Sequence, residues 1–474
     1  MILALTLFPV LSFALAAIPP QRSLRLFARA LFSVGITVAT FALVPQFDAL
    51  SAIFACTVSL LMTLVVLFSG GLLPTPSGEH RPPWSRPSAF FLLVGAFWSS
   101  MLFAVTATTF VGLWAGITAT TLATTFLVAH LGGRTALEAA WKYLMLCSFG
   151  IAVALIGAFM LARAAGDAGI LTGDRFSWGV LALHGARLNT PLARTGLLLM
   201  LVGFATKAGL VPMHAWLPDA HAKAPAPVSA MLSGLLVSCA FYAIVRVQGV
   251  TLHTNAAALF EHVLRDGGAL SLLLGAALML AQRDIKRLLS YSTIEHAGIV
   301  AIALSLATPL GYFIALYHLI DHAFVKSLAF LSVGVVQNEQ GTTSMGHMRG
   351  LRRRPAGIAL LFAAVGLGGL PPGGLFISEL LLMLALVSGA HYWLAVLAAI
   401  ALLVGFAALL RFAIESAAGV PAVDAERPGP KALPVYSSLA LWCVGAGALA
   451  FAIFPFLPQA ARLLELSRTL ASGG

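Results

Sequence analysis

The chain has 474 residues, of which 60% are hydrophobic and 9% are charged, and its formal net charge is +11. A soluble globular domain carries about 25% charged residues, so this composition excludes a soluble protein of ordinary type. The sequence therefore predicts a polytopic membrane protein built entirely from helices.

About fourteen apolar stretches are long enough for a membrane-spanning helix, which needs roughly 20 apolar residues. They begin near residues 2, 27, 51, 88, 109, 136, 195, 226, 268, 288, 311, 355, 392 and 435. The first stretch, Met1 to Ile18, ends in small residues as a signal peptide does, but it lacks a basic start and further spans follow. We therefore expect it to remain as the first helix.

A single membrane domain is expected to fill residues 1–474. The longest polar segments, 165–192 and 415–434, are too short to hold a soluble domain with a core of its own. We divide the domain into N-terminal helices in 1–87, a first repeat in 88–250, a second repeat in 268–415 and a C-terminal helix in 435–474.

Basic residues are concentrated in alternate loops, and this asymmetry predicts the orientation of the chain. The positive-inside rule places these loops in the cytoplasm, so both termini are expected on the periplasmic side of a bacterial inner membrane. This topogenic role explains the basic residues better than nucleic-acid binding does. They are Arg22, Arg25, Arg81, Arg86, Arg134, Lys223, Arg283, Lys286, Arg287, Arg349, Arg352, Arg353 and Arg354.

Two of the predicted helices contain helix-breaking residues. The seventh is expected to break at Pro212 and Pro218, and the twelfth at 369–374, which reads Gly-Leu-Pro-Pro-Gly-Gly. Lys207 precedes the first break and Glu379 follows the second. This mirrored order is what an inverted repeat of helices 4–8 and 9–13 would produce, and broken helices in corresponding places mark transporter sites.

Ionisable residues deep in apolar segments are costly, so they indicate an ion or proton path by default. On helix 11, three of them follow at i, i+4 and i+8 and form a stripe about 12 Å long on one side of the helix. Histidine titrates near neutral pH and a desolvated lysine approaches it, so the stripe is suited to proton conduction. The full set is Lys142, Lys207, Glu295, His296, His318, Asp321, His322, Lys326 and Glu379. Lys142 lies about two turns inside its helix and is also compatible with a structural role in which its ammonium extends to the cytoplasmic interface.

The stripe on helix 11 is also compatible with structural roles. His318 and His322 would serve equally as hydrogen-bonded packing residues, and Lys326 would serve as the partner of Asp321 or Glu379 in an ion pair. Haem ligation is disfavoured, because two histidines on one helix do not face each other. The four cysteines are scattered singly, and no nucleotide-binding loop is present, so we expect no cofactor bound by this chain.

Several motifs resemble the antiporter-like subunits of respiratory complex I. They are 206–221 followed by 224–230, the segment 284–292, and the stripe on helix 11. The same family includes cation/proton antiporter subunits and membrane subunits of energy-converting [NiFe] hydrogenases. Residues 136–144, 292–296 and 369–372 are similar to component F of hydrogenase-4. The resemblance covers roughly residues 90–415.

The resemblance implies a proton-translocating subunit that carries out no redox chemistry itself. Lys207 would be the switching lysine of the first half-channel, and Glu379 the terminal group of the second. The axis between them would contain His318, His322 and Lys326. We add His296 and Asp321 to the candidate proton pathway because they are ionisable residues deep in the same apolar segments. The [NiFe] and iron–sulfur centres would lie in partner subunits of a hydrogenase-4-like complex.

Two positions depart from the family pattern. The helix 5 glutamate that pairs with the helix 7 lysine is replaced by Thr118, and a helix 8 lysine is replaced by Ser238. Asp321 adds an acid that would compensate only if helix 11 approached helix 7. The rival interpretations are a complex I or Na⁺/H⁺ antiporter subunit, and a structural spacer whose proton path is disabled.

Overall fold

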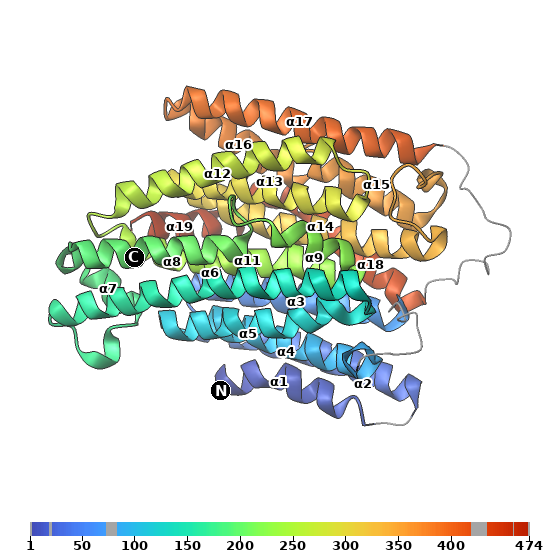
Figure 1. Cartoon of the computed structure of the whole chain (residues 1–474), viewed down its shortest axis with the longest axis horizontal. Coiled ribbons are helices and arrows are strands. Elements are labelled where there is room, and N and C mark those ends of the chain that lie inside the picture. Colours follow the sequence, from blue (N-terminus) through green and yellow to red (C-terminus); the bar gives the residue numbers. More distant parts are fainter. Residues whose placement is uncertain (1, 19–20, 73–82, 419–433, 458, 473–474) are drawn as a thin grey trace.

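The computed structural model describes residues 2–18, 21–72, 83–418, 434–457 and 459–472, and the regular elements within these ranges are helices (Figure 1). Most of the helices run side by side along the long axis of the molecule. This arrangement confirms the predicted all-helical membrane fold.

Residues 2–251, the first half of the chain, contain eleven α-helices. They are α1 (Ile2–Leu15), α2 (Arg22–Leu43), α3 (Ala49–Leu72), α4 (Pro87–Thr106), α5 (Phe110–Val128), α6 (Arg134–Asp167), α7 (Trp178–Leu183), α8 (Pro191–Ala208), α9 (Trp216–Lys223), α10 (Ala226–Met231) and α11 (Val237–Thr251). A π-helical turn, η6 (Leu232–Leu236), joins α10 to α11 without a break.

The second half continues the pattern of long helices. It contains α12 (Ala257–Leu280), α13 (Ile285–Ser305), α14 (Pro309–Gln340), α15 (Pro355–Leu367), α16 (Gly374–Ser388), α17 (Tyr392–Ala417), α18 (Val435–Ile453) and α19 (Gln459–Ala471). Short 3-10 turns flank helices in both halves of the chain. They are η1 (Val44–Gln46), η2 (Pro83–Ser85), η3 (Ala129–Leu131), η4 (Thr172–Asp174), η5 (Gly185–Leu188), η7 (Leu351–Arg353) and η8 (Phe454–Phe456).

Eleven helical segments of the described chain are long and apolar enough to cross a membrane, and shorter apolar helices accompany them. The total of about fourteen spans and the division into two inverted repeats therefore stay predictions. The segment 435–474, predicted as one helix, contains two, α18 and α19. Pro455 in the intervening turn η8 has no backbone N–H to donate, which accounts for the end of α18.

Both predicted helix breaks are present. Between α8 and α9 the chain leaves the helix at Gly209, whose φ of +78° suits glycine, and re-enters it at Trp216. Pro212 lies in this break, but the prediction that Pro218 also breaks the helix is wrong. Pro218 occupies the first turn of α9, where no backbone N–H is needed. The second break, between α15 and α16, coincides with 369–374.

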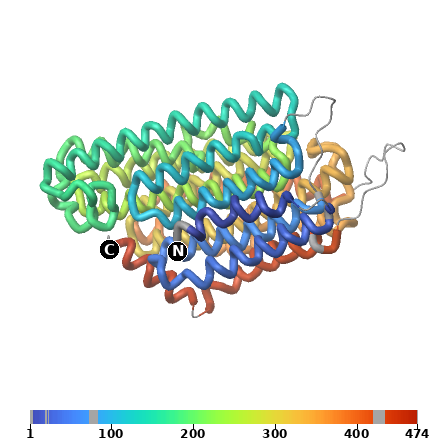
Figure 2. Tube along the Cα trace, turned by 90° about the horizontal axis from the view of Figure 1, so that it is seen from below, coloured from blue at the N-terminus to red at the C-terminus, as the bar shows by residue number. Residues whose placement is uncertain are grey.

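The core of the molecule consists of the central helices. Within the most apolar window of each segment, 100% of 226–251, 94% of α13 and 89% of α14 is buried, against 22% for the segment containing α2. The peripheral helices thus face lipid or partner proteins. Segments far apart in sequence meet at this periphery, where the C-terminal helices lie along the N-terminal ones and α18 packs on α3 (Figure 2). Ser437 Oγ donates to the Phe68 carbonyl at 3.0 Å.

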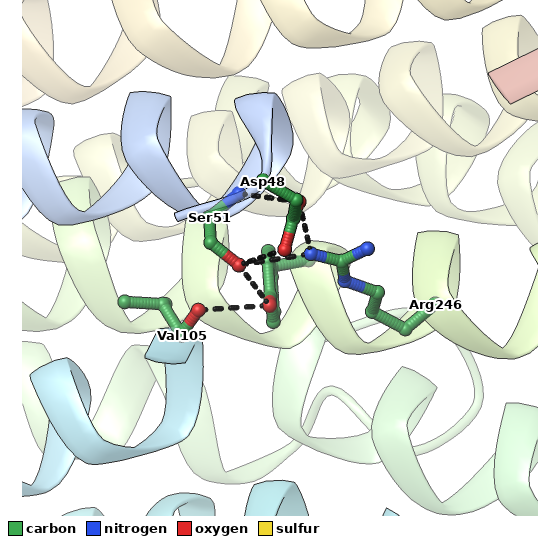
Figure 3. A network of polar contacts seen from close by, with 5 residues as sticks. Asp48, Ser51, Val105 and Arg246 are labelled. Atoms are coloured by element: carbon green, nitrogen blue, oxygen red, sulfur yellow. Dashed lines mark hydrogen bonds and ion pairs between the residues drawn. The ribbon is translucent and has the colours of Figure 1, made fainter. Parts of the chain in front are cut away.

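A polar network ties α3, α4 and α11 together where α3 begins (Figure 3). Arg246 Nη2 donates to Asp48 Oδ1 at 2.5 Å and to Ser51 Oγ at 2.9 Å. Tyr242 donates to the Val105 carbonyl at 2.9 Å, and its hydroxyl lies 2.9 Å from Ser51 Oγ. Asp48 also caps α3, because the Ser51 backbone N–H donates to its carboxylate.

The Asp48 carboxyl lies outside the membrane-spanning segments. Partial burial alone would raise its pKa, but the Arg246 guanidinium and the hydrogen bonds from Ser51 hold that pKa below its usual value. A lowered carboxyl pKa stabilises the fold above the ordinary value near pH ~4, and this contribution is lost as the pH falls through the lowered pKa.

Replacing Asp48→Asn therefore tests the ion pair alone, since Asn caps helices about as well as Asp. We expect a loss of about 1 kcal/mol or less of unfolding free energy near pH ~7, because the carboxylate is half exposed. The gap from wild type should close on acidification to about pH 3 in thermal unfolding experiments in detergent. Asp167→Asn is the control, because Asp167 is about as exposed as Asp48 but its partner Arg163 is 75% exposed, against 12% for Arg246. A gap that widens in acid contradicts the assignment.

Candidate functional site

Lys207 is completely buried in the last turn of α8. Its Nζ donates to Thr121 Oγ1 at 2.8 Å and to the Tyr143 hydroxyl at 2.6 Å, and it lies 4.6 Å from the centroid of the Tyr143 ring. Among the described residues no carboxylate forms an ion pair with it. The ammonium group is therefore solvated by hydroxyl dipoles and an aromatic face rather than neutralised.

We call the groups that surround the Lys207 ammonium (Thr121, Tyr143 and Trp216) the Lys207 cage, and the break after α8 helps to build it. Lys207 lies at the C-terminal end of α8, where the helix dipole favours a cation. Trp216, the first residue of α9, donates its indole N–H to the Thr206 carbonyl at 2.9 Å. The indole ring thereby closes the cage from the far side of the break, with its centroid 5.9 Å from Lys207 Nζ.

The two altered family positions hydrogen-bond within their own helices. Thr118 donates to the Trp114 carbonyl at 2.8 Å, and Ser238 donates to the Gly234 carbonyl at 2.8 Å. The α5 side chain that faces Lys207 is Thr121, about one turn beyond Thr118. The expectation that Thr118 is the position opposite Lys207 is corrected accordingly.

A second cluster contains three histidines from α13 and α14. His296 Nδ1 lies 3.1 Å from His318 Nε2, and the ring centroids of His296 and His322 are 5.1 Å apart. His318 Nδ1 lies 2.8 Å from Ser378 Oγ on α16, a contact that no sequence pattern indicated. All three rings are buried, and these contacts leave Nε2 of His296 and of His322 without a hydrogen-bond partner among the described residues.

Lys326 ends the stripe on α14. Its Nζ donates to the Leu289 carbonyl at 2.8 Å, and the described chain contains no ion pair between it and Asp321 or Glu379. The alternative in which Lys326 is a structural ion-pair partner of those acids is therefore wrong. Its acidic electrostatic neighbour is Glu295 on α13.

The two buried glutamates lie where glycine leaves room for them. Glu295 lies against Gly405 of α17, and a Cβ at that position would overlap its carboxylate. Glu379 in α16 lies against Gly369 in the second break, with φ of +65° at this glycine. Glu295 has Glu379 and Lys326 as its charged neighbours. The acids thus extend the histidine cluster toward the second break.

Asp321 lies beside the start of α16. Its carboxylate lies against the start of α16, where a Cβ on Gly374 would be 2.6 Å from Oδ2 and the backbone N–H of Leu375 faces the carboxylate, and no side chain forms an ion pair with it among the described residues. The hypothesis that Asp321 substitutes for the missing helix 5 glutamate is therefore wrong. The N-terminus of α16 favours an anion at this place through the helix dipole.

His221 on α9 belongs to the site but was missed as a site residue. Its ring is fully buried, stacks on Phe330 of α14 at a centroid distance of 4.9 Å, and has no hydrogen bond at either nitrogen. Its electrostatic neighbours are Lys326 and Lys286. Lys286, expected in a surface loop, is instead 2% exposed and donates to the Ala224 carbonyl at 2.8 Å. The signal in the sequence that pointed to His221 was its place in the segment 206–221, which resembles the family.

The family described as NADH:quinone oxidoreductase/Mrp antiporter, transmembrane, matches residues 107–405. The chain belongs to this family. The hydrogenase-4 component F homolog of Methylacidiphilum infernorum is 36% identical over 335 residues, which cover 69% of each chain. Component B of hydrogenase-4 from Escherichia coli is 30% identical, over 70% of this chain and 49% of that one. The chain therefore spans about half the length of component B.

Solved structures share the fold over the full chain. A subunit of the membrane-bound sulfane sulfur reductase, an archaeal respiratory complex, superposes with a TM-score of 0.84 at 21% identity, covering 100% of this chain and 96% of that one. A subunit of the Mrp complex of Dietzia superposes with a TM-score of 0.82 at 20% identity, covering 99% of this chain and 97% of that one. A subunit of respiratory complex I from Thermus thermophilus superposes with a TM-score of 0.77 at 25% identity, covering 100% of both chains. The predicted family is confirmed.

Metal coordination within the site has no support in the described residues, which contain no group of three or more His, Cys, Asp or Glu side chains placed to hold an ion. The histidines instead contact one another and Ser378. The described interior of this family member thus contains buried, titratable side chains on α8, α9, α13, α14 and α16.

Replacing Tyr143→Phe removes an acceptor from Lys207 and a partner from Thr124 while keeping the aromatic ring. We expect the unfolding free energy to fall by about 1–3 kcal/mol, because a buried ammonium loses a hydrogen bond. Thermal unfolding of the purified chain measures the change. Tyr312→Phe is the matched control, since the buried Tyr312 hydroxyl has no hydrogen-bond partner. Equal losses in the two variants would contradict the proposed cage.

Proposed function

We propose that this chain is a proton-translocating subunit of a hydrogenase-4-like respiratory complex in the bacterial inner membrane. The observation that carries the proposal is the series of buried, titratable side chains from Lys207 through His221 and Lys326 to Glu379. None of these four residues has an ion-pair partner in the described chain. A purely structural lysine or glutamate at this depth would be paired, because an unpaired charge is costly there.

Mutual repulsion gives the histidine cluster a way to move protons. The rings of His318 and His322 are 6.1 Å apart, and the charge of Lys326 acts on both. Two charges about 6 Å apart repel by roughly 3 kcal/mol at an effective dielectric constant of ~20. A proton that arrives at one end of the histidine cluster therefore favours the departure of a proton from the other end. The contacts of His318 with His296 and with Ser378 would carry the transfer between neighbouring groups.

Lys207 would act as the switch of the first half-channel. Its cage offers hydroxyl groups instead of a carboxylate, so no fixed ion pair holds the proton on the ammonium. His221 on α9 would link this half to Lys326, because it belongs to the broken helix of the first half and neighbours the stripe of the second. Asp321, beside the start of α16, would add a proton acceptor near the second break.

The assignment to a hydrogenase-4-like complex is supported by two relatives named as hydrogenase-4 components. Redox chemistry, including [NiFe] and iron–sulfur centres, would belong to partner subunits, and this chain would be non-catalytic. A relative named NADH-quinone oxidoreductase subunit N, from Moorella thermoacetica, is 31% identical over 60% of this chain and 59% of its own length. A complex I or Mrp-type cation/proton antiporter subunit is therefore the second candidate. The basic loops favour periplasmic termini.

Replacing Lys207→Ala should leave the complex assembled and reduce driven proton uptake to background, because the switching charge is lost. The measurement is quenching of a pH-sensitive dye in sealed membrane vesicles. Lys142→Ala is the control: this lysine is exposed and pairs with Glu138 at 2.7 Å. Unchanged uptake in Lys207→Ala would refute the proposed role, and wild-type vesicles without driven uptake would favour a structural spacer.

Gentle solubilisation, capture of the tagged chain and mass spectrometry of co-purifying proteins test the assignment to a complex. We expect subunits with [NiFe] and iron–sulfur binding motifs. Recovery of quinone-reductase or antiporter subunits instead would transfer the chain to the second candidate. Recovery of the chain without any redox or antiporter subunit would contradict both.

A further inference from the structure

Arg29 is a buried cation outside the proton pathway. It lies about two turns inside α2, is 7% exposed, and places its guanidinium carbon 3.8 Å from the centroid of the Phe91 ring on α4. Its Nε has no hydrogen bond, and no carboxylate forms an ion pair with it in the described part of the chain. One aromatic face offsets only part of the cost of burying such a charge.

A groove opens beside this arginine. It has a volume of about 180 Å³ and is lined by residues of α2, α3 and α4, among them Phe27, Arg29, Ala30, Gly70 and Phe91. Phe27 is 67% exposed, and α2 is among the least buried segments, so the groove lies on the outer surface of the helix bundle. It is apolar except for the arginine, as expected of a surface that contacts acyl chains.

The groove lies toward those ends of α2, α3 and α4 that the basic loops connect. Gly70 lies two residues before the end of α3 at Leu72, and Phe91 lies four residues after the start of α4 at Pro87. At 1.5 Å per residue these positions are roughly 3–6 Å inside the helix ends. Arg29 lies seven residues after the start of α2, about 10 Å inside that helix, so its long side chain has to extend toward the basic loops to meet a phosphate group.

We propose that this groove binds an anionic membrane phospholipid, with its phosphodiester paired to Arg29 and an acyl chain against Phe27 and Ala30. A guanidinium matches the oxygens of a phosphate through two parallel hydrogen bonds. Arg25, one turn earlier on α2, adds a second positive charge that acts on Arg29. Two neighbouring cations at the membrane surface favour an anionic over a zwitterionic headgroup. This inference is independent of the proposed proton pathway.

Native mass spectrometry of the full, detergent-purified chain tests the proposal. The probes are phosphatidylglycerol, phosphatidylcholine and inorganic phosphate, added in titrations. We expect phosphatidylglycerol to bind one saturable site about tenfold or more tightly than phosphatidylcholine, and Arg29→Gln to abolish that preference, since charge-assisted hydrogen bonds account for such factors. Arg25→Gln, which removes an equal charge one turn away, should weaken binding by only about twofold to threefold.

A second variant keeps the arginine and fills the groove. Ala30→Trp should lose the bound lipid although Arg29 remains, which separates the groove from a diffuse attraction by basic residues. The proposal is overturned by equal affinities for the two lipids, by an unchanged preference in Arg29→Gln or Ala30→Trp, or by equal losses in Arg25→Gln and Arg29→Gln. Displacement of the lipid by millimolar inorganic phosphate would also overturn the proposal. So would an ion pair between Arg29 and a carboxylate of a partner subunit in the purified complex.

Discussion

Charge buried in a membrane protein must be solvated by the protein itself, and the two helix breaks meet this requirement. Lys207 lies at the C-terminal end of α8, where the dipole favours a cation. Asp321 lies against the N-terminal end of α16, where the dipole favours an anion. A continuous helix would present neither end at this depth. The breaks therefore provide helix ends beside Lys207 and Asp321, whereas the histidines and Lys326 lie within the continuous helices α13 and α14.

The packing of the central helices serves the same requirement. Segment 226–251, α13 and α14 are almost completely buried, so the titratable groups on them contact protein rather than lipid. Glycines admit the bulkier acids: Gly405 on α17 leaves room for Glu295, and Gly369 in the second break leaves room for Glu379. Small residues of this kind let membrane helices approach closely without a hydrophobic driving force.

The chain shares its fold with solved subunits of several respiratory and antiporter complexes. Solved subunits of a sulfane sulfur reductase, an Mrp complex and complex I share this architecture. The fold alone thus does not select the redox partner. Here the ammonium of Lys207 is held by Thr121 and Tyr143, two neutral hydroxyl groups. The proton affinity of this lysine is consequently decided by solvation within a cage rather than by one opposing carboxylate.

Local patterns in the sequence determined the helical membrane fold, both helix breaks and the stripe of His318, His322 and Lys326. These features depend on hydropathy, on Pro and Gly, and on helical periodicity, all of which act over a few residues. Tertiary structure alone decided that Thr121 rather than Thr118 faces Lys207, that Lys286 is buried, and that Ser378 joins the histidines. Such contacts depend on the rotation and depth at which separate helices pack, and these follow from the summed contacts of many side chains that are distant in sequence.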